Sequence, residues 1–467
     1  MRALLSDVVI SMRAGGRTLC AAIVASALLS GCSPGAAPSL LGGASAVPQA
    51  RPAMSPSTPI KHIIVIVQEN RSFDNIFAGF PGAEAPTFGK RHDGTTVPLR
   101  PLGFIAPGDA WGYYSFQQGQ ADYDHGKMDG FDLAQNINKL PVGNDVYSYI
   151  PRNLVAPYWT MAHQYVLADH MFPTMFGPSY TGHLTLVAGD TLLQTGLAEV
   201  DTPTAMPWGC DAPAGTGSDT YSSSGVYTYK NGPFPCFDDS NSIFGPKTIA
   251  ASLDAAKVSW KYYDPALSNP GFQWSVFDSI RDVRYGPDWK NNVSSPPTNV
   301  LKDISSGDLP AVSYVIPDWL DSDHSDTNSN TGPSWVASVV NAVGQSKYWN
   351  SSAIVVVWDD WGGWYDNVPP PQLDFLGLGI RVPCIIISPY ARAHYVSHTQ
   401  YEFGSVLKFI EQTFGVPSLG ATDARAASLV DSFNFLQSPR KFVPVSAPYS
   451  MIHFLRAKPS HRAPDDM

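Results

Sequence analysis

Charged residues are scarce in this chain of 467 residues, and basic residues cluster nowhere along it. Asp, Glu, Lys and Arg together make up 15% of the sequence, and the formal net charge is −10 at pH 7. Proteins that hold nucleic acid release counterions from its phosphates through clusters of Lys and Arg. Nucleic acid is therefore not an expected partner of this protein.

Long hydrophobic runs are also missing, apart from one short run near the first residue. The stretch from Leu19 to Leu29 is apolar, follows scattered arginines and leads into Ser30-Gly31-Cys32. This run is too short to cross a membrane comfortably and has the order of an export signal. Its end resembles the lipobox at which bacterial lipoproteins are cleaved and acylated on cysteine.

These residues predict an exported protein that is lipid-anchored in the bacterial cell envelope, in the periplasm or at the outer membrane. We expect a signal peptide over residues 1–31, an acylated Cys32 and a flexible tether over residues 32–58, where Ser, Pro and Ala are frequent. The alternative is an ordinary signal peptide that is cut elsewhere. The lipid anchor would be the contact of the chain with the membrane.

Cysteine is rare as well, with five residues in the whole chain, two of them in the signal segment. Cys384 lies within the apolar run 382–387 and is expected to be a buried, inert thiol. Cys210 and Cys236 flank a segment rich in Gly, Ser, Tyr and Pro. In an oxidising compartment a disulfide between them would remove about 3 kcal/mol of unfolded-state entropy, so we predict this bond.

No internal repeat is visible, and the patterns of the chain predict one α/β domain. Runs rich in Val and Ile without alternation indicate strands buried on both faces, and they cover residues 62–67, 312–316, 353–358 and 382–387. Residues 335–343 and 403–414 have helical spacing, and Gly415 follows the second of them. We expect a central, mostly parallel sheet flanked by helices, in a catalytic domain over residues 59–460 with an insertion at about 201–247.

Two of these strands end in polar pairs that could bind a metal ion. The first runs into Glu69-Asn70, and a later one runs into Asp359-Asp360, which Trp361-Gly362-Gly363 follow. The carboxyl ends of parallel strands meet at one edge of a sheet, where ligands gather. Carboxylate and amide oxygens suit a hard divalent cation. The alternative is that each pair only caps a helix or begins a glycine turn.

A nucleophile and several histidines complete the set of candidate residues. Ser179 lies in Gly-Pro-Ser-Tyr-Thr-Gly-His, between turn-forming residues, and is the best-placed hydroxyl, although a turn residue is an equal alternative. Four histidines could contact a phosphate group or a leaving group: His125, His183, His324 and His398. A lone histidine is more often a surface or hydrogen-bonded residue, and His324 has the strongest case because Asp residues flank it.

Together these segments resemble the phosphoesterase family that contains bacterial acid phosphatases and non-specific phospholipases C, related in core fold to alkaline phosphatase. The similarity rests on Glu-Asn-Arg-Ser-Phe-Asp at 69–74, Gly-Lys-Met-Asp-Gly-Phe at 126–131 and Asp-Asp-x-Gly-Gly at 359–363. Weaker similarities cover residues 169–183, 323–324, 397–411 and 429–435. They extend over most of the chain after the signal segment.

The resemblance implies a metal-dependent phosphoesterase with a phosphoserine intermediate. By this resemblance the metal ligands are Glu69, Asn70, Ser179, Asp359 and Asp360, and Ser179 takes the phosphoryl group. The phosphate site is lined by His125, His183, Asp323 and His324. We expect His324 to protonate the leaving oxygen, with Asp323 fixing its orientation. The metal identity does not follow from the sequence.

The chain departs from the family pattern at two positions. It has Thr181-Gly182 where the family has Pro-Asn, and Asp366-Asn367-Val368 where the family has Asp-His-Val. Two activities fit the remaining residues, a phosphatase for small phosphate esters and a phospholipase C for phospholipid headgroups. A binding lipoprotein with a degenerate site is the alternative from another class. A carboxylate-pair glycosidase would leave Asn70 and Ser179 without a role.

Overall fold

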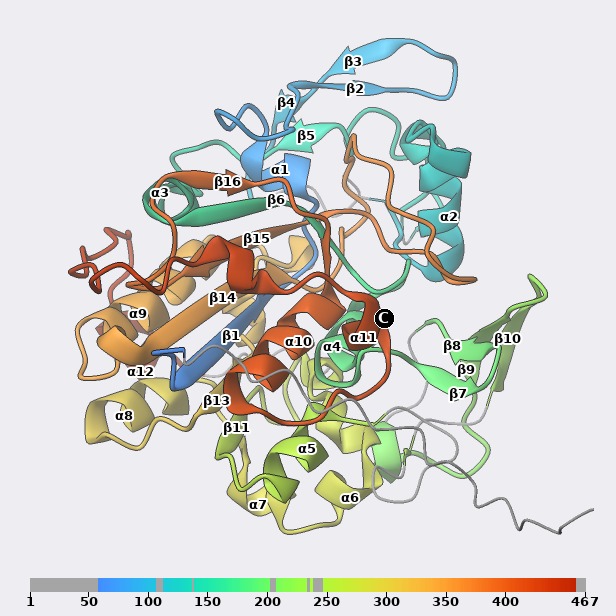
Figure 1. The fold of residues 1–467 in the computed structure, drawn as a ribbon. Helices are drawn as coiled ribbons and strands as arrows, with labels where there is room; N and C mark the ends of the chain where they lie inside the picture. Colours follow the sequence, from blue (N-terminus) through green and yellow to red (C-terminus); the bar gives the residue numbers. More distant parts are fainter. Residues whose placement is uncertain are drawn as a thin grey trace, which may run out of the picture. The chain divides into compact units, whose positions relative to one another are not determined.

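The computed structural model describes most of the chain after residue 57 (Figure 1). The described residues are 58–105, 112–136, 138–201, 207–232, 236–237 and 247–458. Cys32, the predicted signal peptide and nearly all of the predicted tether lie outside them. All described residues belong to one compact unit.

A nine-stranded sheet forms the centre of this unit. Its strands follow the order β12-β11-β13-β1-β14-β15-β6-β16, and β17 also pairs with β6. Every pairing is parallel except the two that β15 makes with β14 and β6, so only β15 among the strands of this sheet runs in the reverse direction. The strand bounds are β1 His62–Gln68, β6 Val166–Phe172, β11 Trp260–Tyr263, β12 Val293–Ser294, β13 Val312–Val315, β14 Ser352–Trp358, β15 Val382–Ile387, β16 Tyr395–Ser397 and β17 Tyr401–Glu402.

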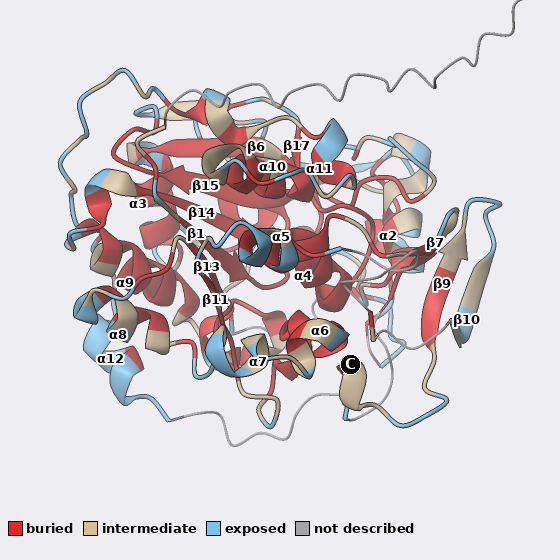
Figure 2. Ribbon diagram, turned by 60° about the horizontal axis from the view of Figure 1, so that its bottom comes forward, coloured by how far each residue is buried: buried red, intermediate tan, exposed pale blue. Residues whose placement is uncertain are grey.

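Helices cover the sheet, and Figure 2 shows its strands as mostly buried. One helix pair, α3 (Ala156–Gln164) and α9 (Gly332–Gly344), packs together and contacts β6, β14 and β15. A second pair, α4 (Ser179–Ala188) and α10 (Phe403–Phe414), lies side by side in Figure 1. In the described part of the chain the other α-helices are α1 Phe73–Phe77, α2 Phe116–Tyr123, α5 Ile249–Ala255, α6 Arg281–Arg284, α7 Asp288–Asn291, α8 Asn299–Ser306, α11 Thr422–Arg425 and α12 Met451–Arg456.

The buried strands explain why the sequence lacks alternation in this sheet. All seven residues of β14 are buried, as are all residues of β1 after His62. A strand that helices cover on both faces needs apolar side chains on both. The predicted fold class, a mostly parallel sheet flanked by helices, is therefore confirmed. The predicted helix at 403–414 matches α10, which ends at Gly415 in the left-handed conformation that glycine favours.

A smaller antiparallel sheet contains β7 (Leu192–Gln194), β8 (Leu197–Glu199), β9 (Ser218–Ser222) and β10 (Tyr227–Gly232). Two short pairs join β2 (Phe88–Lys90) with β3 (Thr96–Pro98) and β4 (Arg100–Pro101) with β5 (Ser148–Tyr149). The predicted disulfide between Cys210 and Cys236 is present, and Cys384 is a buried free thiol as expected. Within the described residues, every helix is too short or too polar to cross a membrane.

Candidate active site

Two neighbouring strands bring the predicted metal ligands together. β1 and β14 are parallel, and their last residues, Gln68 and Trp358, lie opposite each other. Glu69 and Asn70 therefore emerge beside Asp359 and Asp360. The backbone N–H of Asn70 donates to Oδ1 of Asp359 over 2.9 Å. The parallel register of β1 and β14 thus brings these four residues together, as predicted.

Two glycines allow the loops around these acids to pack backbone against backbone. Gly362 has φ +61°, and a side chain there would place its Cβ 2.1 Å from the carbonyl oxygen of Asn70. Gly363 has φ +74°, and its Cβ would lie 2.2 Å from the carbonyl oxygen of Gly112. Only glycine adopts such a left-handed conformation at no steric cost and leaves room for that approach. The Gly-Gly pair thus fixes both the Asn70 loop and the segment before α2.

The predicted nucleophile lies at the start of α4, against the same acids. Ser179 is the first residue of this helix and is 6% exposed. Its Oγ lies 3.1 Å from Oδ1 of Asn70 and 3.4 Å from Oδ2 of Asp360. The first turn of a helix carries unpaired N–H groups and a partial positive charge. The Ser179 hydroxyl is thus at a position that favours anionic groups.

His183, one turn further along α4, lies inside the carboxylate cluster. Its Nε2 is 2.6 Å from Oε1 of Glu69 and 3.8 Å from Oδ2 of Asp359. Ligand atoms of these three buried residues lie within 4.8 Å of one another. Burial lowers the pKa of His183 to about 3, which keeps the ring neutral. We predicted a phosphate contact for His183, and the structure instead places it among the groups that could hold a metal ion.

The electrostatics of this cluster fit a divalent cation. Glu69, Asp359 and Asp360 are fully buried, and burial raises the pKa of each carboxyl, with their mutual repulsion adding to the rise for Glu69 and Asp360. Among the described residues, no Lys or Arg forms an ion pair with any of the three. A buried negative charge without a partner is costly. Carboxylate oxygens, an amide oxygen and an imidazole nitrogen are ligands for divalent metal ions.

His324 reaches the cluster, and it contacts a tyrosine that the sequence did not indicate. Its Nε2 lies 2.8 Å from the hydroxyl of Tyr114 and 3.3 Å from the Asn70 amide. Its Nδ1 accepts the backbone N–H of Asp326 over 3.2 Å. Tyr114 stands in a short stretch without hydrophobic periodicity, so no pattern could have predicted its place.

The expectation that Asp323 orients the ring of His324 is wrong. Asp323 has φ +73°, and its Oδ2 accepts a hydrogen bond from Tyr158 over 2.7 Å. Arg71 donates to the carbonyl oxygen of Asp323 over 2.9 Å. Among the described residues, this carboxylate is thus hydrogen-bonded to Tyr158 and not to the neighbouring imidazole. Asp323 therefore supports the loop that carries His324 rather than the ring itself.

His125 does not join the other predicted phosphate ligands. It is exposed and has φ +55° at the end of α2. Among the described residues, no hydrogen bond or ion pair links its ring to the carboxylate cluster. His398 also lies elsewhere, with Nδ1 2.9 Å from Oδ2 of Asp169. The sequence could not separate these histidines from His183, because only the fold decides which of them approach β1 and β14.

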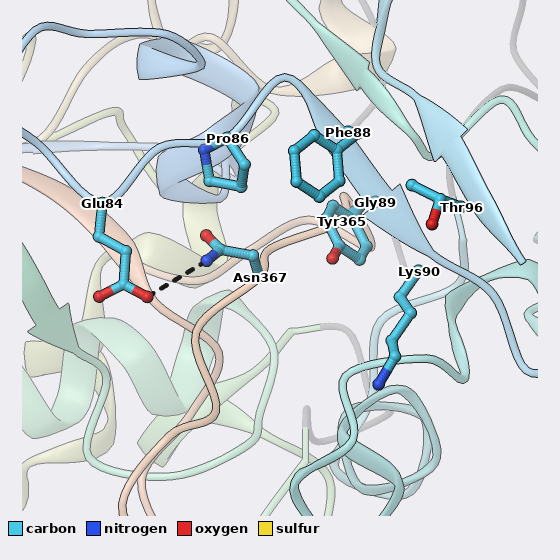
Figure 3. A pocket seen from close by; sticks show the side chains of 8 residues that line it. All are labelled: Glu84, Pro86, Phe88, Gly89, Lys90, Thr96, Tyr365 and Asn367. Carbon is cyan, nitrogen blue, oxygen red and sulfur yellow. Dashed lines mark hydrogen bonds between the residues drawn. The ribbon is translucent and has the colours of Figure 1, made fainter. Parts of the chain in front are cut away.

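The two departures from the family pattern have different surroundings. A Cβ on Gly182 would lie 2.6 Å from the carbonyl oxygen of Asp359, so α4 approaches that strand end more closely than a larger residue would allow. Asn367 accepts from Arg381 over 2.9 Å and its Nδ2 lies 3.4 Å from Glu84. It lines a cavity of about 410 Å³ beside β2, shown in Figure 3. Gly182 thus touches the cluster, and Asn367 belongs to another pocket.

Comparison with known proteins gives consistent matches over most of the chain. The model of the phosphoesterase family matches residues 60–417. Phospholipase C A of Mycobacterium tuberculosis is 28% identical, with 83% of this chain and 79% of that protein covered. Phospholipase C B of the same species is 24% identical, with 83% and 80% covered. Non-specific phospholipase C3 of Arabidopsis thaliana is 22% identical, with 84% and 77% covered.

A solved structure of a protein in the alkaline phosphatase superfamily from Vibrio parahaemolyticus also matches. It covers 82% of this chain and 76% of its own, with 11% identity and a TM-score of 0.37. The family match spans the strands and loops that carry Glu69, Ser179 and Asp359. The chain therefore belongs to the phosphoesterase family and is a hydrolase of phosphate-ester bonds.

Proposed function

We propose that this protein is a metal-dependent phosphoesterase that uses Ser179 as nucleophile and forms a phosphoserine. The observation that carries the proposal is the position of Ser179 Oγ, 3.1 Å from Asn70 and 3.4 Å from Asp360 at the start of α4. A serine needs activation to attack phosphorus, and buried carboxylates beside its hydroxyl provide a site where its proton can go.

In the proposed reaction, Ser179 Oγ attacks phosphorus in line with the leaving alcohol. The Oγ–P bond forms as the ester P–O bond breaks, the hydroxyl proton passes to Oδ2 of Asp360, and the leaving oxygen takes a proton from water and departs as the alcohol. The N–H groups of the first turn of α4 stabilise the charge on the phosphoryl oxygens. Water then attacks phosphorus from the opposite side, the Oγ–P bond breaks, and Oγ of Ser179 takes back the proton from Asp360. Catalysis of this kind rests mainly on positioning and charge stabilisation.

Residues that would hold the metal ion are Glu69, Asn70, Ser179, His183, Asp359 and Asp360. Such an ion, when bound, lowers the cost of the serine alkoxide and neutralises charge on the transferred group. These residues supply carboxylate oxygens, an amide oxygen, a hydroxyl oxygen and a neutral imidazole nitrogen. His324 and Tyr114 lie at the edge of this set, where they can contact a phosphoryl or leaving oxygen.

For the substrate we propose phosphate esters with phospholipid headgroups as the first candidates, since several of the curated relatives are phospholipases C. Small phosphate monoesters are the second candidates, because the same groups could act on either ester. We also propose that the protein is exported and lipid-anchored in a bacterial cell envelope through Cys32. The binding lipoprotein remains the alternative, motivated by Gly182 and Asn367.

The test measures hydrolysis of phosphatidylcholine and of a chromogenic phosphate monoester, with and without a chelator. Ser179→Ala and Asp359→Asn should be folded and inactive on both. Ser334→Ala serves as the control, because this buried serine also lies in the first turn of a helix, α9, where its hydroxyl accepts from the backbone N–H of Tyr449. Full turnover by Ser179→Ala would refute the nucleophile. No turnover of any ester with any added metal ion would favour the binding lipoprotein.

A further inference from the structure

The residues on either side of Tyr114 in the sequence are hydrogen-bonded or closely packed. Gly112, two residues earlier, packs its carbonyl oxygen where a Cβ on Gly363 would be. The backbone N–H of Tyr113 donates to Gln135 over 2.7 Å, and Ser115 caps α2 by accepting from the backbone N–H of Gln118. The rings of Tyr114 and Trp361 meet edge to face at 6.3 Å. These contacts place the hydroxyl of Tyr114 at the edge of the site, 2.8 Å from Nε2 of His324.

The backbone determines which nitrogen of His324 carries the proton. The N–H of Asp326 can only donate, and it points at Nδ1 of His324 over 3.2 Å. A neutral imidazole that accepts at Nδ1 carries its hydrogen on Nε2. That Nε2–H lies 2.8 Å from the hydroxyl oxygen of Tyr114 and donates to it. One lone pair of the Tyr114 oxygen is thereby used.

The amide of Asn70 has two possible orientations, and they differ in what faces the carboxylates. In one, Nδ2 donates to Oε2 of Glu69 over 2.8 Å and to Asp359 over 3.1 Å, and Oδ1 lies 2.6 Å from the Tyr114 hydroxyl. In the other, Oδ1 faces the carboxylates and accepts from Ser179, and Nδ2 lies beside Tyr114. The second orientation turns the amide oxygen toward the carboxylate oxygens of Glu69 and Asp359, which a cation favours and an empty cluster disfavours.

We propose that Tyr114 is a positioning residue that holds the Asn70 amide with its oxygen toward the cation. In that orientation Nδ2–H of Asn70 donates to the Tyr114 oxygen, as Nε2–H of His324 does. The inference rests on the proposed function, because it assumes a cation at the carboxylate cluster. Tyr114 lies outside the ligand set, yet on this proposal it controls whether the amide oxygen of Asn70 can bind the cation.

Removing the hydroxyl gives a specific result. In Tyr114→Phe, Nδ2 of Asn70 loses its acceptor when Oδ1 faces the carboxylates. Rotation of the amide then places Nδ2 on Glu69 and Asp359 and Oδ1 on Nε2–H of His324, at 3.3 Å. This rotated amide competes with the cation. Loss of a hydrogen bond that orients a metal ligand costs about 10- to 100-fold in metal affinity.

The test is calorimetric titration of chelator-stripped protein with Mg²⁺, Ca²⁺, Mn²⁺ and Zn²⁺ in turn. For an ion that the wild type binds, Tyr114→Phe should raise Kd about 10- to 100-fold. Tyr113→Phe is the matched control, because this neighbouring tyrosine is 46% exposed, and its Kd should stay within about twofold. In an Asn70→Ala background, Tyr114→Phe should change Kd less than about threefold, because the group it acts through is gone.

Each other outcome overturns a defined part of the account. Wild-type affinity in Tyr114→Phe refutes the role of Tyr114 and leaves the cation site standing. An equal loss in the Asn70→Ala background shows that Tyr114 does not act through Asn70, and this also refutes the proposal. If the wild type binds none of the four ions, the cation site and the role of Tyr114 both fall. Melting temperatures of all variants are measured alongside, and a loss of affinity that only follows a loss of stability refutes positioning.

Discussion

Replacing Gly182 by alanine tests how closely α4 must approach the acids after β14. The new Cβ would lie 2.6 Å from the carbonyl oxygen of Asp359 and 3.2 Å from its Cβ. Ordinary contacts begin at 3.4 Å, so helix and strand end must separate by about 0.8 Å. Alanine favours a helix interior by about 1 kcal/mol over glycine, whereas overpacking costs about 1 to 3 kcal/mol. The net loss of stability is therefore about 0 to 2 kcal/mol.

We expect a large loss of activity and only a small loss of stability in this variant. Ser179 lies on the same helical turn, and its Oγ is 3.4 Å from Asp360. A displacement of about 1 Å between reacting groups costs about 100-fold in rate. We expect kcat/KM on a chromogenic phosphate ester to drop about 10- to 100-fold, with a small decrease in melting temperature.

Gly404→Ala is the matched control for this experiment. Its Cβ would lie 2.6 Å from the carbonyl carbon of Thr422, an equally close clash, in a helix that supplies no residue of the cluster. It should lose similar stability and keep its activity. The reasoning is refuted if Gly182→Ala keeps wild-type kcat/KM, or if both variants lose activity equally.

Three further predictions concern stability. Reduction of the disulfide, or Cys210→Ser, should lower the free energy of unfolding by about 3 kcal/mol, and thermal melting with and without reductant measures it. Arg381→Met leaves Asp74 and Asp366 buried without their partner and should cost about 3 to 5 kcal/mol in chemical denaturation; a loss below about 1 kcal/mol contradicts this. Burial raises the pKa of Asp323 to about 7. Its stabilising contribution is full below the unfolded pKa of about 4 and disappears as the pH rises toward 7. The difference in free energy of unfolding between the wild type and Asp323→Asn should therefore be larger at pH 4 than at pH 8, by up to about 4 kcal/mol.

The sequence predicts those parts of the fold that local pattern determines. Runs of Val and Ile indicated β1, β13, β14 and β15 almost to the residue, because a strand covered on both faces cannot carry alternating polar side chains. The helix ending at Gly415 was equally clear, since a helix often ends with a glycine in the left-handed conformation. The reversed direction of β15 was not predictable, because direction depends on the long connection from β14 and not on the strand itself.

In the candidate site, too, local sequence patterns predicted some residues, and only the fold identifies the others. The acids after β1 and β14 were predictable from their place at strand ends, and the distant Ser179 from its turn-rich motif. His183 and His125 each stand next to a glycine, yet one is buried against Glu69 and the other is exposed. Tyr114 reaches Asn70 only because Gly363 admits the backbone of Gly112. Such contacts between distant segments have no signature in a single sequence.

The most direct test of the central claim is a search for phosphate on Ser179. The protein is mixed with a phosphate ester, quenched in acid within the first turnovers, digested and analysed by mass spectrometry. The account predicts one added phosphoryl group on the peptide that contains Ser179, absent from Ser179→Ala and from chelator-treated protein. Turnover without phosphate on that peptide, or with phosphate on another residue, would contradict it.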